Sequence, residues 1–188
     1  MPGQPQRHYS VDDYFAVEAT STIKHEYYQG EIFAMAGASV AHNDITASVL
    51  ATLRVALRGT GCRAFGSDLR LRTPEGLYTY PDVMVICGHI ELTPDRPDTV
   101  TNPVLLVEVL SDATRDYDRG EKFTLYKAIP SLREYLLIEQ NQVAVDYRQR
   151  QEPNEWRSTA YDVLSAVVRL GFVPVELALN EIYRDVFA

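Results

Sequence analysis

The apolar run NPVLLVEVL, residues 102–110, restricts the fold of this chain more than any other feature of its sequence. Side chains alternate between the two faces of a strand, so Leu106, Glu108 and Leu110 share one face and the intervening residues share the other. Apart from Glu108, both faces are apolar. A strand of this kind is usually an interior strand, which other elements must cover on both sides.

The segment after this strand predicts a crossover connection. Residues 116–129 have the pattern of a helix that stops at Pro130, because proline cannot continue a helix. The strand-like run LREYLLIEQ follows, and the connection is long enough to return the chain parallel to the first strand. Such a crossover is expected to be right-handed.

The other patterns complete a mixed fold. We predict a short helix capped by Ser10, a hairpin turning at Gln29 and Gly30, and a long helix over residues 39–57. Strands are predicted for CRAFGSDLRLRT, YTYPDVMVICG and QVAVDYRQR, and a short helix for LALNEIYRDVF. Together these elements predict an α/β fold of the α+β mixed-sheet kind, with helices flanking a central mixed β-sheet. The length of 188 residues fits one domain, residues 1–188.

The composition is that of an ordinary globular protein, with 46% hydrophobic and 23% charged residues. No apolar run approaches the roughly 20 residues of a membrane span. The polar start lacks the apolar centre of a secretory signal, so a cytoplasmic location is expected. The net charge of −8 argues against a protein that holds nucleic acid through a broad basic surface. Cys62 and Cys87 match no zinc spacing, and we predict that both are reduced, mostly buried residues.

Glu108 needs a partner if its strand is buried. An uncompensated carboxylate there would cost several kcal/mol unless hydrogen bonds, a cation or a metal stabilise it. One interpretation is an arginine at the rim of the sheet. A second interpretation involves Asp82, which follows Pro81 at the start of the strand YPDVMVI. If the two strands are antiparallel neighbours, Asp82 lies beside Glu108, and the two carboxylates form the oxygen-rich site that Mg²⁺ prefers.

Lys122 is the third candidate residue. It lies in the first turns of the predicted helix that leaves the Glu108 strand, so its ammonium group can reach back over the carboxyl end of that strand. The alternative is an ordinary ion pair with Asp118, four residues earlier on the same helix, which contributes only a few tenths of a kcal/mol.

Three stretches together resemble the Uma-type endonuclease family, a branch of the PD-(D/E)XK nuclease superfamily: EYYQGEIFAMAGASVAHNDI, YPDVMVI and VEVLSDATRDYDRGEKFTLYKAIPSLREYLLI. The resemblance implies a restriction-endonuclease-like domain in which Asp82 and Glu108 bind Mg²⁺ or Mn²⁺. The general superfamily pattern places a lysine two residues after the glutamate, where this chain has Leu110. In the Uma-type pattern the lysine comes from the following helix, and Lys122 matches that position.

The resemblance also implies roles for a glutamate and a histidine, matched here by Glu31 and His42. Glu31 is then a third carboxylate beside the metal, or otherwise an exposed residue of the hairpin turn. His42 contacts phosphate or water, or otherwise caps or packs the start of the long helix. Ser111, Thr114 and Arg115 follow the acidic strand and are further candidates for contacting the scissile phosphate.

The resemblance implies metal-dependent hydrolysis of a phosphodiester in nucleic acid, with DNA as the expected substrate and a homodimer as the expected assembly. The metal lowers the pKa of a bound water and polarises the phosphorus, while Lys122 positions that water and offsets charge in the transition state. The rival interpretation is a nuclease-like binding or assembly module that does not cut. A third is a metal-dependent hydrolase with a narrower pocket for a smaller phosphorylated substrate. No dinucleotide fingerprint, P-loop or GxSxG elbow favours another chemistry.

Overall fold

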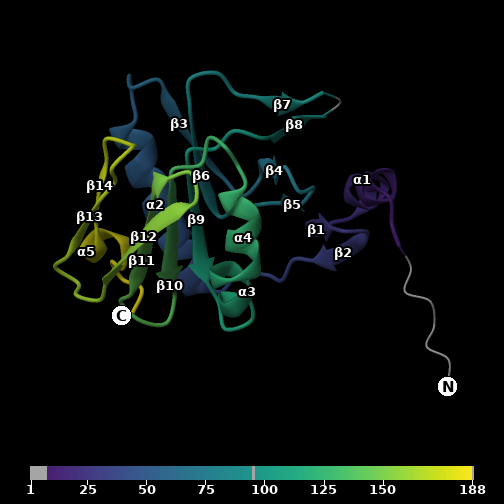
Figure 1. The fold of residues 1–188 in the computed structure, drawn as a ribbon. Coiled ribbons are helices and arrows are strands. Elements are labelled where there is room, and N and C mark those ends of the chain that lie inside the picture. The colour runs from purple at the N-terminus through teal and green to yellow at the C-terminus, as the bar shows by residue number, and fades with distance from the viewer. Residues whose placement is uncertain (1–7, 95, 188) are drawn as a thin grey trace.

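The structure is a computed structural model that describes residues 8–94 and 96–187 (Figure 1). The helices are α1 (Val11–Thr20), α2 (Val40–Ala56), α3 (Arg115–Arg119), α4 (Glu121–Lys127) and α5 (Leu179–Ile182). The strands are β1 (His25–Tyr28), β2 (Glu31–Ala34), β3 (Cys62–Gly66), β4 (Arg70–Arg72), β5 (Tyr78–Thr79), β6 (Val83–Cys87), β7 (Leu92–Thr93), β8 (Arg96–Val100), β9 (Leu105–Leu110), β10 (Glu134–Glu139), β11 (Val145–Glu152), β12 (Glu155–Tyr161), β13 (Val167–Arg169) and β14 (Glu176–Ala178). None of the helices in these residues is long and apolar enough to cross a membrane.

Six strands form the central mixed sheet, in the order β12-β11-β10-β9-β6-β3. Strands β9 and β10 are parallel, with Glu134 opposite Leu105, and the other neighbours in this sheet pair antiparallel. All six residues of β9 are buried, as expected for an interior strand. Helices α3 and α4 connect β9 to β10, which confirms the predicted crossover connection.

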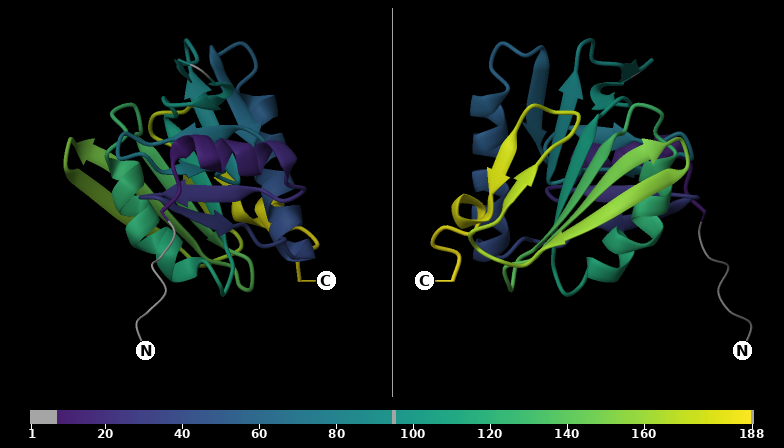
Figure 2. Two further views of the ribbon diagram at one scale, coloured as in Figure 1. Left: turned by 90° about the vertical axis from the view of Figure 1, so that its right-hand side faces the viewer. Right: turned by 60° about the vertical axis from the view of Figure 1, so that its left-hand side comes forward.

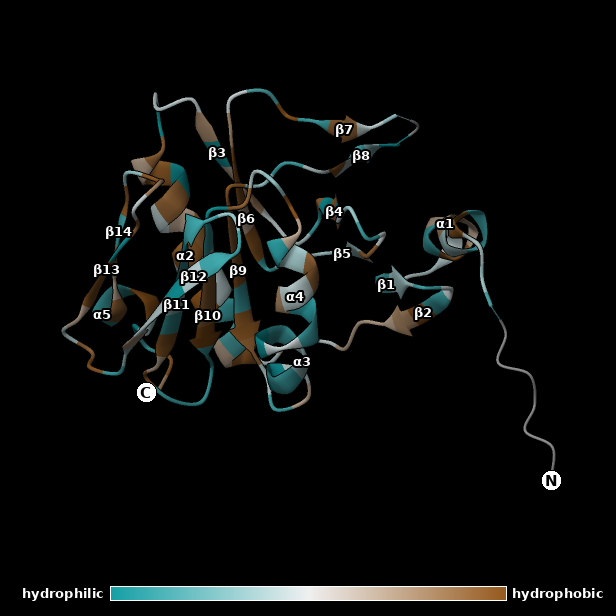
Figure 3. Ribbon diagram, in the orientation of Figure 1, coloured by the Kyte–Doolittle hydropathy of each residue, from teal (hydrophilic) through white to brown (hydrophobic). Residues whose placement is uncertain are grey.

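Helices cover both faces of the central sheet (Figure 2). On one face, α2 packs Ile45, Val49 and Leu53 into the larger hydrophobic core. On the other face, α4 packs Phe123 and Tyr126 into a second core. Coloured by hydropathy, β9 and β10 are predominantly hydrophobic and lie between these helices (Figure 3). The predicted fold class, with helices flanking a central mixed sheet, is confirmed.

A second six-stranded sheet, in the order β2-β1-β5-β4-β8-β7, lies beside the central sheet. Helix α1 packs against it through an aromatic cluster of Tyr14, Phe15, Tyr27 and Tyr78. The predicted hairpin is confirmed, because β1 and β2 pair across the turn at Gln29 and Gly30. Both turn residues have positive φ, 47° and 85° respectively, a conformation that glycine adopts readily.

Three predicted elements are each divided in the structure. The run YTYPDVMVICG forms β5 in the second sheet and β6 in the central sheet. The run CRAFGSDLRLRT forms β3 and β4, which belong to different sheets, because the chain turns where Leu69 N–H donates to Gly66 O at 3.3 Å. The helix predicted over residues 116–129 is interrupted at Gly120, whose φ of −111° and ψ of −92° are not helical. A Cβ atom at Gly120 would lie only 3.0 Å from Asp116 O, so the absence of a side chain permits this break.

The prediction that both cysteines are reduced is wrong, because Cys62 and Cys87 form a disulfide. They stand directly opposite each other in the antiparallel pair of β3 and β6. Opposed residues on neighbouring antiparallel strands bring their Cβ atoms within reach of an S–S bond. The separation of 25 residues along the chain does not reveal this pairing, which depends on β3 lying beside β6.

Candidate active site

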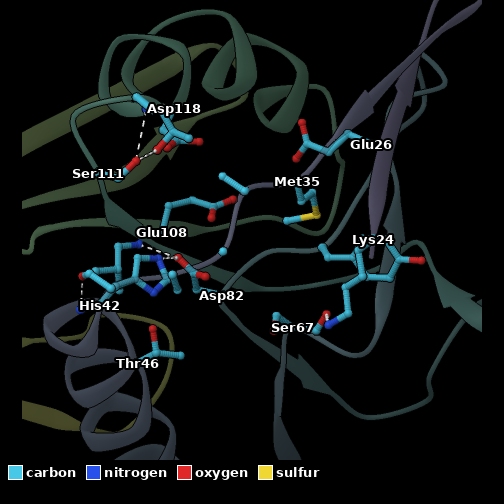
Figure 4. Close-up of a pocket in the computed structure, with 18 of the residues that line it drawn as sticks. Lys24, Glu26, Met35, His42, Thr46, Ser67, Asp82, Glu108, Ser111 and Asp118 are labelled. Carbon is cyan, nitrogen blue, oxygen red and sulfur yellow. Dashed lines mark hydrogen bonds and ion pairs between the residues drawn. The ribbon is translucent and has the colours of Figure 1, made fainter. Parts of the chain in front are cut away.

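Asp82 and Glu108 lie opposite each other, as predicted from their strands. In the antiparallel pair of β6 and β9, Val83 faces Val107, so the residue before β6 stands across from Glu108. Asp82 Oδ2 accepts a hydrogen bond of 2.7 Å from Val109 N–H, which ties this carboxylate to β9. Both carboxylates line a cavity of about 770 Å³ whose walls include residues of the two large sheets, α2, α3 and α4 (Figure 4).

Glu108 is buried and has two partners. Its Oε1 accepts a hydrogen bond of 2.7 Å from Tyr126 Oη and lies 3.0 Å from Lys122 Nζ. The required compensation therefore comes from α4 rather than from an arginine at the rim. Burial raises the pKa of Glu108 to about 8; Lys122 opposes this shift, whereas the charges of Asp118 and Asp82 add to it.

Lys122 is buried among three carboxylates. Its Nζ lies 3.0 Å from Glu108 Oε1, 3.1 Å from Glu26 Oε1 and 3.3 Å from Asp118 Oδ1. Burial alone would lower the pKa of Lys122, but the surrounding negative charges, led by Glu108, hold it well above its ordinary value. Lys122 on α4 therefore contacts Asp118 on α3, across the break at Gly120, and also reaches the β9 carboxylate.

The carboxylate that approaches from the hairpin is Glu26, which the sequence interpretation missed. Glu26 is buried on β1, and its Oε1 accepts a hydrogen bond from Thr79 Oγ1 in addition to the Lys122 contact. Glu31 begins β2 opposite Tyr28, next to the turn, and it does not line the cavity. The sequence contains no signal comparable to that of Glu108, because Glu26 lies between His25 and Tyr27 in the polar and aromatic strand HEYY.

His42 joins the site from the first turn of α2. Its Nε2 lies 3.2 Å from Asp82 Oδ2, and its backbone N–H donates to Ser39 Oγ, the N-cap of that helix, at 3.0 Å. Burial opposes protonation of the imidazole, but the hydrogen bond to Asp82 and the charge of Asp82 outweigh burial and raise the pKa of His42. His42 can therefore orient the Asp82 carboxylate.

The loop after β9 contributes two of its three candidate residues. Ser111 and Thr114 line the cavity, and their hydroxyl groups lie 3.1 Å apart. Arg115 does not line the cavity. Its guanidinium group makes hydrogen bonds of 2.9–3.1 Å to both oxygens of Glu139 and one of 3.0 Å to Asp112. These contacts engage Arg115 in the packing of α3 against β10.

Carboxylates outnumber cations around the cavity. The carboxylates that line it are those of Glu26, Asp82, Glu108, Asp112 and Asp118. The lysines that line it are Lys122 and Lys24, and Lys24 is already paired with Asp68 at 2.6 Å. A further cation would offset the repulsion between these carboxylates.

The donor set fits a hard divalent cation. Contacts within the described residues engage Oδ2 of Asp82 and Oε1 of Glu108, which leaves the second oxygen of each carboxylate for another ligand. In this part of the chain, no three His, Cys, Asp or Glu side chains are already grouped around a metal position. Mg²⁺ tolerates such a site, because one or two carboxylates usually bind it while it keeps several waters and contacts substrate phosphates.

Comparisons with known proteins place this geometry in a family context. Two proteins of Synechocystis sp. (strain ATCC 27184 / PCC 6803 / Kazusa), both called uncharacterized, are similar along most of their length. The protein sll1609 is 37% identical over 164 residues, 87% of this chain and 93% of its own. The protein slr1290 is 35% identical over 186 residues, 97% of this chain and 95% of its own.

A crystal structure shares the fold. It belongs to a "putative nuclease belonging to DUF820" from Anabaena variabilis ATCC 29413, with a TM-score of 0.73 and 16% identity, and the match covers 89% of this chain and 93% of that chain. This similarity confirms the restriction-endonuclease-like fold. A family profile with the description "Putative restriction endonuclease" matches residues 11–180. The chain therefore belongs to the Uma2 family.

Proposed function

We propose that this protein is a divalent-metal-dependent endonuclease that hydrolyses phosphodiester bonds of nucleic acid, with DNA as the first substrate to test. The observation that carries the proposal is the convergence on one cavity of Asp82, which directly precedes β6, Glu108 of β9 and Lys122 of α4. Two carboxylates and an ammonium group at one point are costly to bury, and the core alone does not require them. The family description and the shared nuclease fold support the same reaction class.

Each side chain of the site has a defined part in this chemistry. Asp82 and Glu108 would hold Mg²⁺ or Mn²⁺, with their orientations fixed by Val109 N–H and Tyr126 Oη respectively. When bound, such a cation lowers the pKa of water and offsets charge on a phosphate. Lys122 remains protonated among its carboxylates, so its ammonium group can position the attacking water and offset charge in the transition state.

The rival candidate is a binding or assembly module that does not cut, and the charge of the chain favours it. The net charge is −8, and Lys24 and Lys122, the lysines of the cavity, are paired with carboxylates. Binding of nucleic acid would then depend on few contacts. A homodimer stays a prediction under either candidate.

A cleavage assay separates the two candidates. Purified protein is incubated with plasmid, single-stranded DNA and RNA in Mg²⁺ or Mn²⁺, beside Asp82→Asn, Glu108→Gln and the control Glu31→Gln. We expect metal-dependent cutting that falls at least about a hundredfold in the first two variants and persists in the control, because Glu31 lies outside the cavity. If the wild type cuts none of the substrates, or if cutting survives both site variants, the nuclease proposal fails.

A further inference from the structure

A second cavity, of about 480 Å³, lies beyond the C-terminal end of α4, where β10 begins. Arg133 and Arg150 line it together with Phe172, which is 52% exposed. Glu152 is the carboxylate in its wall. The cavity shares no lining residue with the candidate active site.

The two arginines of this cavity repel each other. Arg150 N–H donates to Arg133 O at 2.8 Å, which makes them cross-strand partners at the ends of β10 and β11. Like charges directly opposite each other on neighbouring strands destabilise a sheet. Burial, followed by the charge of Arg133, lowers the pKa of Arg150. Within the residues that the structure describes, neither guanidinium group forms an ion pair with a carboxylate.

An aromatic ring lies near each guanidinium group, and backbone carbonyl groups hold that of Arg150 in place. Cζ of Arg150 lies 4.9 Å from the centre of the Trp156 ring, and Cζ of Arg133 lies 6.0 Å from the centre of the Phe172 ring. Only 8% of Arg150 is exposed, and its Nη2 donates to the carbonyl groups of Lys127 and Ile129, the latter at 3.2 Å. The Nε atom of Arg150 is buried and has no hydrogen-bond partner among the described residues. This arrangement places two positive charges beside a cavity, and no carboxylate of the described residues forms an ion pair with them.

We propose that this cavity binds the phosphate group of a nucleotide, with Phe172 available to stack against the base. Because Nη2 of Arg150 already donates to two carbonyl groups, the cavity offers phosphate oxygens the N–H groups of Arg133 together with the positive charge of Arg150. Aromatic side chains also provide platforms on which bases stack, whatever their identity. The phosphate can come from a free mononucleotide or from a nucleic acid strand. In the second case the site contacts the nucleic acid strand away from the cavity of Asp82 and Glu108. That second case rests on the proposed function.

The protein carries its own probe for this site, because Trp156 is the single tryptophan of the sequence. Its fluorescence is titrated in EDTA with inorganic phosphate, with thymidine 5′-monophosphate, and with a thymidine dinucleotide whose one phosphate is internal. We expect a saturable change that weakens at least about tenfold in Arg133→Gln. Arg157→Gln is the matched control, since Arg157 is an exposed neighbour of Trp156 that does not line the cavity.

Two further readouts separate binding from folding. Arg133→Gln should melt at the same or a higher temperature without ligand, because it relieves the repulsion of Arg150, yet phosphate should no longer stabilise it. Phe172→Ala should weaken the binding of both nucleotides more than it weakens the binding of inorganic phosphate. The titration is repeated in Asp82→Asn. Unchanged binding of the three ligands would show that this site does not depend on Asp82, so its test would stand even if the cleavage assay failed.

Each outcome has one meaning. Tighter binding of the mononucleotide than of the dinucleotide assigns the site to a terminal phosphate, and the reverse order assigns it to a strand. Equal responses of the wild type and Arg133→Gln to all three ligands overturn the proposal. Binding of inorganic phosphate with no gain for either nucleotide overturns its nucleotide part.

Discussion

Replacing Glu108 by glutamine should make the stability of the metal-free protein less sensitive to a rise in pH from 5 to 8.5. Burial raises the pKa of Glu108 from an ordinary 4.5 to about 8, with Lys122 opposing the shift and the charges of Asp118 and Asp82 adding to it. The unfolded chain therefore loses this proton at lower pH than the folded protein does. Between the two pKa values the folded state binds more protons, so its stability falls as the pH rises through this window. Glutamine does not titrate, so the stability of the Glu108→Gln variant does not decrease with pH for this reason.

The size of the effect follows from the shift. A difference of 8 − 4.5 = 3.5 pKa units corresponds to about 5 kcal/mol. Relaxation of the site and entry of water make the real effect smaller than this upper bound. As the pH rises from 5 to 8.5, we therefore expect the free energy of unfolding of the variant to increase by about 1–3 kcal/mol relative to that of the wild type. For a chain of this length, each kcal/mol shifts the melting temperature by about 2–4 °C.

Urea denaturation in EDTA, repeated across this pH range, measures the gain. Glu121→Gln is the control, because it makes the same chemical change at an exposed position of α4 and should follow the wild type. Saturating Mg²⁺ should then stabilise the wild type by about 2.7 kcal/mol at one hundred times its Kd, and Glu108→Gln by much less. A difference between variant and wild type that stays constant from pH 5 to pH 8.5 would refute the reasoning about Glu108.

Three further predictions concern the supports of the site. Tyr126→Phe removes the buried 2.7 Å hydrogen bond to Glu108 and should lower the free energy of unfolding by about 1–2 kcal/mol; an unchanged urea midpoint would count against that bond. Asp82→Asn should lower the pKa of His42, since Asp82 raises it. An NMR titration that gives the same imidazole pKa in the wild type and the variant would contradict the pairing. Ser39→Ala removes the N-cap of α2 and should cost about 1 kcal/mol in thermal unfolding, whereas Ser39→Asn should retain most of the stability.

The parts of the site that local patterns describe were predictable. Glu108 is recognisable because one charge interrupts an apolar strand, and Pro81 marks the start of the neighbouring strand just before Asp82. Antiparallel pairing of those strands is then enough to bring the two carboxylates together, as the register of β6 and β9 confirms. Lys122 follows because the helix after β9 must return over the sheet.

The parts that depend on packing between distant elements were not predictable. Glu26 reaches Lys122 only because the hairpin of the second sheet lies against α4, and no local pattern fixes that contact. The Cys62–Cys87 disulfide likewise depends on strand pairing. The break at Gly120 depends on the close approach of Asp116 O, which sequence spacing does not reveal.

A calorimetric titration with Mn²⁺ tests the central claim most directly, namely that Asp82 and Glu108 hold a divalent cation. The wild type and Glu31→Gln should bind Mn²⁺ alike, because Glu31 lies outside the cavity. Asp82→Asn and Glu108→Gln should each weaken binding strongly, since each loses a carboxylate ligand. Binding of Mn²⁺ that is equal in all four proteins, or absent from the wild type, would contradict the account.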